Sequence, residues 1–299
     1  MGTDLLHEIL QQLINGIVMG GVYALVALGL TLIFGVLRVI NFAHGEFYMM
    51  GAYFGLIMAA KLKLPYLLAL VLAIAAVTLI GIFIERIIFR PVRGSDPINF
   101  IISSFGLSIC LQSAALHIFG PQPAIIPFAL GNTIIRFWGL SLTVQRLIIP
   151  LFAFVLIGSF HLFIKRSWLG IMIRAVSQNL SVSMLMGIDI NRVAMYTFAI
   201  GSALAGVAGI LIGSTFLLQP TMGNMVVLKS FTVVILGGMG NFYGAAGAGL
   251  LLGITEGLTA GFITSDFKDI FAFVMVIIVL LFRPEGIFAR RSEIYESYE

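Results

Sequence analysis

Charged residues are scarce in this sequence of 299 residues. Asp, Glu, Lys and Arg make up 10% of it, whereas a soluble domain carries about 25%. Hydrophobic residues make up 60%, and the mean hydropathy is +1.10. A soluble protein this apolar could not cover its surface with polar groups. We therefore expect a membrane protein, and residues 1–299 are expected to form a single transmembrane domain because no polar stretch is long enough for a separate soluble one.

Residues that carry catalytic or metal chemistry are equally sparse. The single cysteine, Cys110, excludes an internal disulfide. The histidines are scattered without a His-x-x-x-His or Cys-x-x-Cys partner, and the phosphate-binding pattern Gly-x-x-x-x-Gly-Lys-Ser/Thr is absent. Lysines and arginines fall between apolar stretches rather than in a patch, which argues against nucleic acid binding. We predict that the chain is not an enzyme, holds no metal and binds no cofactor of its own.

Long apolar runs are what the sequence does contain. A helix that crosses a bilayer needs about 20 predominantly apolar residues. Such stretches lie near 13–36, 46–60, 64–84, 98–119, 146–164, 192–213, 225–240, 244–263 and 267–282. They predict an all-α fold, a polytopic membrane helix bundle of about eight or nine transmembrane helices. Broken or short helices are expected as well, because a glycine run interrupts the region between 225 and 263.

The orientation of the bundle follows from the lysines and arginines of its connections, since cytoplasmic loops are richer in both. The richer set comprises Arg86, Arg90, Arg93, Lys165, Arg166, Arg174, Arg192, Arg283, Arg290 and Arg291. The other set holds acidic residues and fewer cations, although Lys61 and Lys63 depart from the rule. The pattern predicts a multi-pass protein with its N-terminus outside and its C-terminus in the cytoplasm, which requires an odd number of crossings.

Two connections are long. Residues 120–145 are rich in turn residues and predict an extracytoplasmic irregular loop or short hairpin. Residues 165–191 lack proline and predict short helices on the cytoplasmic side, closed by Gly187 as a left-handed cap. A plain solvated connector is the alternative, but the length favours a cytoplasmic coupling loop that docks on a partner. The candidate coupling residues are Gly170, Arg174, Ala175, Gln178, Asn179 and Gly187.

A polar motif at the entry to an apolar stretch is the strongest local signal. It places Asn41, His44 and Glu46 where polar groups are expensive unless they face protein or water. An ordinary helix start is the simpler explanation of the motif, because Asn41 could cap the helix and Glu46 would favour its positive end. The alternative is a role in the transport pathway or its gate.

A glycine run and a carboxylate complete the candidates for the pathway. Gly237, Gly238, Gly240 and Asn241 precede a stretch of small residues. Small residues let helices pack closely in lipid, yet bare glycines also break a helix, which is tolerated at membrane depth only inside protein or along a cavity. Glu256 lies within an apolar stretch and is either an intramembrane functional group or a residue near the outer interface.

The polar motif and the glycine run have a similar build. In each of the segments 41–52 and 237–249, polar and glycine residues precede a helix rich in small residues. Paired interruptions of this kind point to a transport pathway. We hypothesise that both helices begin within or just below the inner leaflet and flank an inner gate, where their backbone N–H groups could steady a substrate carboxylate.

Several motifs resemble the permease subunits of branched-chain amino acid ABC importers, the LivH-type family, over essentially the whole chain. They are Gly29–Val36 with Ile40–Glu46, Glu85–Arg93, Arg174-Ala175 with Gly187-Ile188, Phe198–Gly206, Leu236–Gly240 and Arg283–Phe288. The resemblance implies a bacterial-type inner membrane protein that works with a second related permease (LivM-like), two cytoplasmic ATPase subunits that use ATP, and an extracytoplasmic solute-binding protein. It implies import of branched-chain or other hydrophobic amino acids, while relatives carry urea, amides or aromatic acids.

Two other classes of protein are alternatives to an importer subunit. An ion-coupled secondary transporter normally buries ionisable residues for coupling, and Glu256 is the main candidate here. A membrane-embedded enzyme needs a clustered catalytic set, which we do not find in the sequence. The missing phosphate loop means that an importer of this kind takes its energy from partner subunits.

Overall fold

The computed structural model describes residues 2–127, 133–137, 140–263 and 267–288. Its elements are α1 (Gly2–Leu37), α2 (His44–Leu56) with a π-helical turn (Ile57–Lys61), α3 (Tyr66–Ile84) with a second π-helical turn (Glu85–Phe89), α4 (Arg90–Val92), α5 (Pro97–Phe119), β1 (Ile134–Phe137), β2 (Leu140–Thr143), α6 (Val144–Arg166), α7 (Trp168–Gln178), α8 (Leu180–Leu185), α9 (Ile190–Gly213), α10 (Met222–Gly237), α11 (Phe242–Phe262) and α12 (Lys268–Phe282). The C-terminal residues 289–299 lie outside the described part.

Each apolar stretch of the sequence forms a helix, which confirms the expected polytopic helical bundle. Within the described residues, six helices are long and apolar enough to cross a membrane: α1, α3, α5, α6, α9 and α11. The helices α2, α10 and α12 are shorter, with 13, 16 and 15 residues. The prediction of short or broken helices is therefore confirmed, and two of these three helices form the candidate site described below.

Helix α1 is the centre of the bundle. It packs along α11 and also contacts α9, α6 and α10. Glycines allow the close approach to α11, because a Cβ atom on Gly20 would lie 2.9 Å from the Cα of Leu250 and one on Gly16 would lie 2.7 Å from the Cα of Ile254. Small residues at such a crossing let two backbones meet where lipid gives no hydrophobic drive for association.

Helices α5 and α6 lie at the periphery. In their most apolar stretches only 17% and 22% of the residues are buried, compared with 83% in α1. Their exposed side chains include Ile102, Phe105 and Leu151. An exposed apolar face of this size suits hydrocarbon or another membrane subunit.

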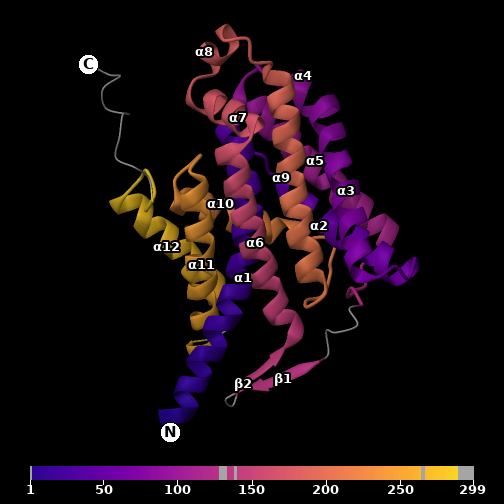
Figure 1. Cartoon of the computed structure of the whole chain (residues 1–299), viewed down its shortest axis with the longest axis vertical. Helices are drawn as coiled ribbons and strands as arrows, with labels where there is room; N and C mark the ends of the chain where they lie inside the picture. The colour runs from indigo at the N-terminus through magenta and orange to yellow at the C-terminus, as the bar shows by residue number, and fades with distance from the viewer. Residues whose placement is uncertain (1, 128–132, 138–139, 264–266, 289–299) are drawn as a thin grey trace.

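The connections lie at opposite ends of the bundle (Figure 1). The antiparallel β1–β2 hairpin and the start of α1 lie at one end, and α7 and α8 lie at the other. The expected short hairpin within 120–145 and the expected short helices within 165–191 are both confirmed. Residues 128–132 and 138–139 of the first connection are outside the described part. The orientation of the two ends across the membrane stays a prediction.

Candidate transport pathway

Helix α2 begins deep inside the bundle. After α1 ends at Leu37, the chain turns back, and the ring Nε2 of His44 comes within 3.1 Å of the carbonyl oxygen of Val26. Val26 precedes the end of α1 by 11 residues, so α2 begins about 16 Å from that end, at 1.5 Å per residue. The returning segment is held by Asn41, whose Oδ1 accepts from the N–H of Ala43 at 3.1 Å. His44 and Asn41 are both buried and anchor the start of α2.

Helix α10 also begins inside the bundle, and it approaches from the opposite end. After α9 ends at Gly213, the chain returns and α10 starts at Met222. The N-terminal ends of α2 and α10 meet there, because a Cβ on Gly223 would lie 2.7 Å from the carbonyl oxygen of Gly45. This contact between Gly45 and Gly223 is called the α2–α10 crossing below. Two half-length helices thus meet end to end within the membrane bundle.

A polar cluster occupies the α2–α10 crossing. Glu46 is fully buried, and its Oε1 accepts from the hydroxyl of Ser108 at 2.9 Å and from the side-chain amide of Gln112 at 2.8 Å. Gln112 pairs in turn with Asn224 through two amide hydrogen bonds of 2.5 and 3.2 Å. The Oε2 atom of Glu46 has no hydrogen-bond partner in the described part of the chain. Because both helices present their positive N-terminal ends here, they stabilise the carboxylate.

The cluster reaches the surface of the chain at this depth. Glu46 is buried, Gln112 is half-buried and Asn224 is exposed. Polar side chains that face hydrocarbon are costly, so such residues almost always face protein or a water-filled space. The Gln112–Asn224 face is therefore a candidate for contact with another subunit or with an aqueous path.

The glycine run lies at a different depth from Glu46. Gly240 faces Gly35, two residues before the end of α1, so this turn lies at the end of the bundle that carries α7 and α8. Asn241 caps α11, with its Oδ1 accepting from the N–H groups of Tyr243 and Gly244, both at 3.1 Å. The two interrupted segments thus do not meet: α2 crosses α10, whereas α11 starts near the end of the bundle.

The C-terminal motif packs against this glycine turn. The N–H of Ile287 donates to the carbonyl of Leu236 at 2.8 Å, and the amide of Asn241 donates to the carbonyl of Phe288 at 2.8 Å. Gly238 and Gly286 have positive φ values of 89° and 99° and lie against each other. A groove of about 890 Å³ runs beside the contact, lined by Met239, Tyr243, Glu285 and their neighbours.

Glu256 belongs to a buried charge network that sequence reasoning did not identify. Lys229 of α10 forms ion pairs with Glu256 at 2.9 Å and with Asp269 of α12 at 2.7 Å, and it donates to the hydroxyl of Tyr23 at 3.1 Å. Tyr23 donates in turn to Glu256 at 2.8 Å. The network joins α1, α10, α11 and α12. Lys229 is the residue from which the sequence could have predicted this network. A lysine within an apolar stretch requires a buried partner of opposite charge.

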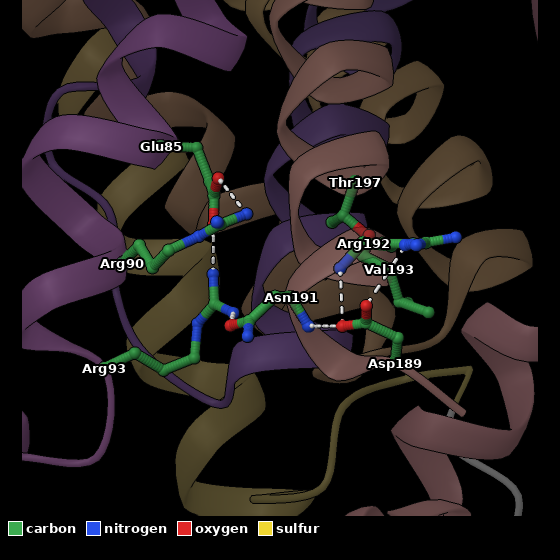
Figure 2. Close-up of polar contacts among 8 residues, drawn as sticks. All are labelled: Glu85, Arg90, Arg93, Asp189, Asn191, Arg192, Val193 and Thr197. Carbon is green, nitrogen blue, oxygen red and sulfur yellow. Dashed lines mark hydrogen bonds and ion pairs between the residues drawn. The ribbon is translucent and has the colours of Figure 1, made fainter. Parts of the chain in front are cut away.

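A second set of charges (Figure 2) lies near α4, at the end of the bundle that carries α7 and α8 (Figure 1). The fully buried Glu85 pairs with Arg90 at 3.6 Å and with Arg93 at a shorter distance. Arg93 also donates to the side-chain carbonyl of Asn191 at 2.9 Å. Asp189 caps α9 next to it. The motif Glu85–Arg93 thus fastens the end of α3 to the start of α9, and these ion pairs explain its spacing.

The coupling candidates lie on α7, α8 and the turns that flank them. Gly170 packs on the backbone of Ile164, and Arg174 donates to the carbonyl of the same residue. The carbonyl of Gln178 accepts from Arg38 at 3.3 Å, Asn179 caps α8 through its bond to Val182, and Gly187 adopts a φ of 81°. Ala175 lies on α7 between these contacts. Helix α7 is therefore held on the bundle, and α8 packs against α7.

The outward side of this helix pair is apolar. Leu185, Met186 and Trp168 have 86%, 77% and 74% of their surface exposed. Arg174 points back to the bundle, so these side chains, rather than Arg174, form the surface that a partner would meet. Whether any coupling candidate contacts a partner stays a prediction.

Comparison with known proteins identifies the family. Residues 12–280 match the model of the "Branched-chain amino acid transport system / permease component" family. This chain belongs to that permease family. It is 38% identical to the high-affinity branched-chain amino acid transport system permease protein BraD of Pseudomonas aeruginosa, over 95% of this chain and 97% of BraD. It is 36% identical to LivH of Escherichia coli K12, over 94% of this chain and 96% of LivH.

The permease also resembles a solved structure in fold. It matches a chain of "PsaBC from Streptococcus pneumoniae in complex with Fab" with a TM-score of 0.50 and 13% identity, covering 91% of each chain. A similarity at this identity concerns the fold alone. The permease thus shares its helical fold with that solved chain.

Proposed function

We propose that this permease is the membrane-spanning subunit of an ATP-binding-cassette importer. It moves branched-chain or other hydrophobic amino acids, or a related small solute, inward across a bacterial-type inner membrane. The α2–α10 crossing supports this most directly, because interrupted helices with polar groups at membrane depth line transport pathways. The printed names of BraD and LivH describe high-affinity branched-chain amino acid transport, which supports the same class of substrate.

The proposed assembly contains a second, related permease, two cytoplasmic ATPase subunits and an extracytoplasmic solute-binding protein. The exposed Gln112–Asn224 pair supports a partner in the membrane, because it lies at the depth of the crossing and needs a polar or proteinaceous neighbour. This chain binds no cofactor, and the ATPase subunits use ATP. Nucleotide shifts the permease between states only through a different affinity for each state.

Helices α7 and α8 are the proposed contact with the ATPases. Helix α7 is fixed to the bundle through Gly170 and Arg174, and the end of α8 with its following turn exposes Leu185 and Met186. A rigid element with an apolar outer surface transmits a push from a docked partner to the ends of α1 and α6. The coupling loop 165–191 therefore carries the closure of the ATPases into the membrane.

The ion-coupled alternative loses its main candidate in this arrangement. Glu256 pairs with Lys229, and a carboxylate held by a buried ammonium is not a free ion-coupling group. An importer powered by partner subunits needs no such group.

Reconstitution of the whole complex tests the proposal. The permease, its partner permease, the ATPases and the binding protein are placed in proteoliposomes, and uptake of labelled leucine and labelled urea is measured. We expect leucine uptake that depends on ATP and on the binding protein. ATP hydrolysis by the purified permease alone, or uptake driven by an ion gradient without ATP, would refute the assignment.

A pair of glycine variants tests the coupling surface. Gly187 and Gly120 have positive φ values of 81° and 76°, and a Cβ on either would meet nothing within 4 Å. Valine at Gly187 introduces backbone strain of about 1–2 kcal/mol. Gly120 has a ψ of 177°, a conformation that is almost exclusive to glycine, so valine there is strained at least as much and is a stringent control. Gly187→Val should abolish stimulation of ATP hydrolysis by the loaded binding protein, whereas Gly120→Val, at the other end of the bundle, should leave it unchanged. Equal effects would indicate a plain connector.

A further inference from the structure

We infer that the Glu46 carboxylate receives the N–H groups of the transported solute. The α2–α10 crossing then selects amines and amides, α-amino acids above all, against carboxylic acids that lack such groups. The inference rests on the proposed function and adds the recognition element to it.

Glu46 differs from the other buried carboxylates in how its charge is balanced. Glu85 pairs with two arginines and Glu256 pairs with Lys229. No Lys, Arg or His among the described residues lies within ion-pair distance of Glu46. One of its oxygens is satisfied by Ser108 and Gln112, and Oε2 has no hydrogen-bond partner among them. A buried acceptor left unpaired costs free energy, and an N–H donor from a ligand removes that cost.

The surroundings of Glu46 supply the complementary half of the ligand. The N-terminal ends of α2 and α10 meet at Gly45 and Gly223, and the Oε1 of Glu46 would lie 3.0 Å from a Cβ on Gly223. Helix N-termini bind anions and polarised oxygens through their backbone N–H groups. A carboxylate acceptor beside two such ends matches an ammonium beside a carboxylate, which is the arrangement in an α-amino acid. A 2-oxo acid offers no donor to Glu46 and is repelled by its charge.

The crossing is closed in this structure, and a route to it is present. Gly45 and Gly223 are in contact, so no solute-sized space separates α2 from α10. The Gln112–Asn224 pair leads from Glu46 to the exposed face of α5 and α10. A small displacement of α10 from α2 breaks that pair and opens Glu46 to a solute arriving between this permease and its partner.

Charge and shape at position 46 can be separated by substitution. Glu46→Gln keeps the shape of the side chain and removes its charge, whereas Glu46→Asp keeps the charge and shortens the side chain. Tyr53→Phe is the matched control, because Tyr53 lies on the same helix and its buried hydroxyl has no partner among the described residues. Each variant is reconstituted as the full complex, and leucine uptake is measured at saturating loaded binding protein.

We expect Glu46→Gln to lower leucine uptake by about ten-fold or more, since a hydrogen bond to a charged group contributes that much or more. Glu46→Asp should keep clearly more uptake than Glu46→Gln, and Tyr53→Phe should match the parent protein. ATP hydrolysis stimulated by the binding protein and the melting temperature of the complex should stay similar throughout. A purely structural Glu46 would give the reverse order, because glutamine preserves packing better than aspartate.

Uptake by Glu46→Gln equal to or above that by Glu46→Asp overturns the inference. If the Glu46→Gln variant does not assemble, the comparison is repeated with Glu46→Asp and Glu46→Asn, whose side chains have the same shape. More leucine uptake by the Glu46→Asp variant supports the inference, and equal uptake by the two variants refutes it. The proposed function fails separately, when the parent complex takes up neither leucine nor urea with ATP.

Discussion

Buried acids are neutralised in three different ways in this permease. Glu85 is held by arginines, Glu256 by Lys229, and Glu46 by two helix ends and neutral donors. The sequence placed Glu46 and Glu256 within apolar stretches but could not identify their partners, because these come from distant helices. Lys229 was visible as a cation in an apolar stretch and predicts a buried ion pair, yet its acids follow it by 27 and 40 residues. The sequence thus shows which charged side chains lie within apolar stretches, but it does not show which residue each of them pairs with.

Removing Lys229 should strongly destabilise the bundle. Lys229→Met leaves the charge of Glu256 buried without its cation, and breaking a buried pair on one side costs about 3–5 kcal/mol. The partly exposed Asp269 loses the same partner. The free energy of unfolding of the purified permease is measured by denaturant titration. Lys61→Met, at an exposed lysine, serves as the control and should change it little. The double variant Lys229→Met/Glu256→Gln should recover part of the loss, and its failure to do so would argue against the pair.

For helices α2 and α10, the sequence predicts that each helix exists but not how deep in the bundle it begins. The apolar runs predicted both helices. The observed helices begin at His44 and Met222, only two and three residues before the predicted starts. Their depth was not predictable, because it depends on the returning segments 38–43 and 214–221, which are held by contacts with α1, α5 and neighbouring loops. The glycine run was expected to mirror the polar motif, but hydropathy does not distinguish a turn at the end of the bundle from a break inside it.

Two helical glycines should respond differently to alanine. A Cβ on Gly209 of α9 would overlap the carbonyl oxygen of Tyr48 on α2, whereas one on Gly158 of α6 would meet nothing within 4 Å. Gly209→Ala should therefore push α2 away from α9 and lower the melting temperature of the permease. Gly158→Ala should leave it unchanged or raise it, because alanine favours a helix by about 0.5–1 kcal/mol. Equal melting temperatures would contradict the α2–α9 packing.

The whole molecule is a bundle arranged around α1, with α5 and α6 exposed at its periphery. Its polar connections are divided between two ends, with the hairpin at one and α7, α8 and the Glu85–Arg93 motif at the other (Figure 1). The distribution of lysine and arginine predicts that the second end faces the cytoplasm. The face that carries Gln112 and Asn224 is where we propose that the partner permease packs.

Labelling from one side of the membrane checks this orientation. Single cysteines replace the exposed Ser95 and Leu185 at the predicted inner end, and Gln122 at the predicted outer end, in a Cys110→Ser background. An impermeant thiol reagent added to intact cells should label only the cysteine at position 122. Labelling at 95 or 185 before the cells are opened would reverse the predicted topology.

The sequence by itself determined the class of the protein. Composition required a membrane environment, apolar runs of bilayer length required helices, and the motifs indicated the family. All of these depend on local residue chemistry and on spacing along the chain. Tertiary structure alone decided that α2 and α10 meet end to end, that Glu46 lies between them with an unused oxygen, and that Lys229 balances Glu256. Those features need segments up to 177 residues apart to come into contact, as Glu46 and Gly223 do, and backbone approach of that kind depends on the packing of the whole bundle.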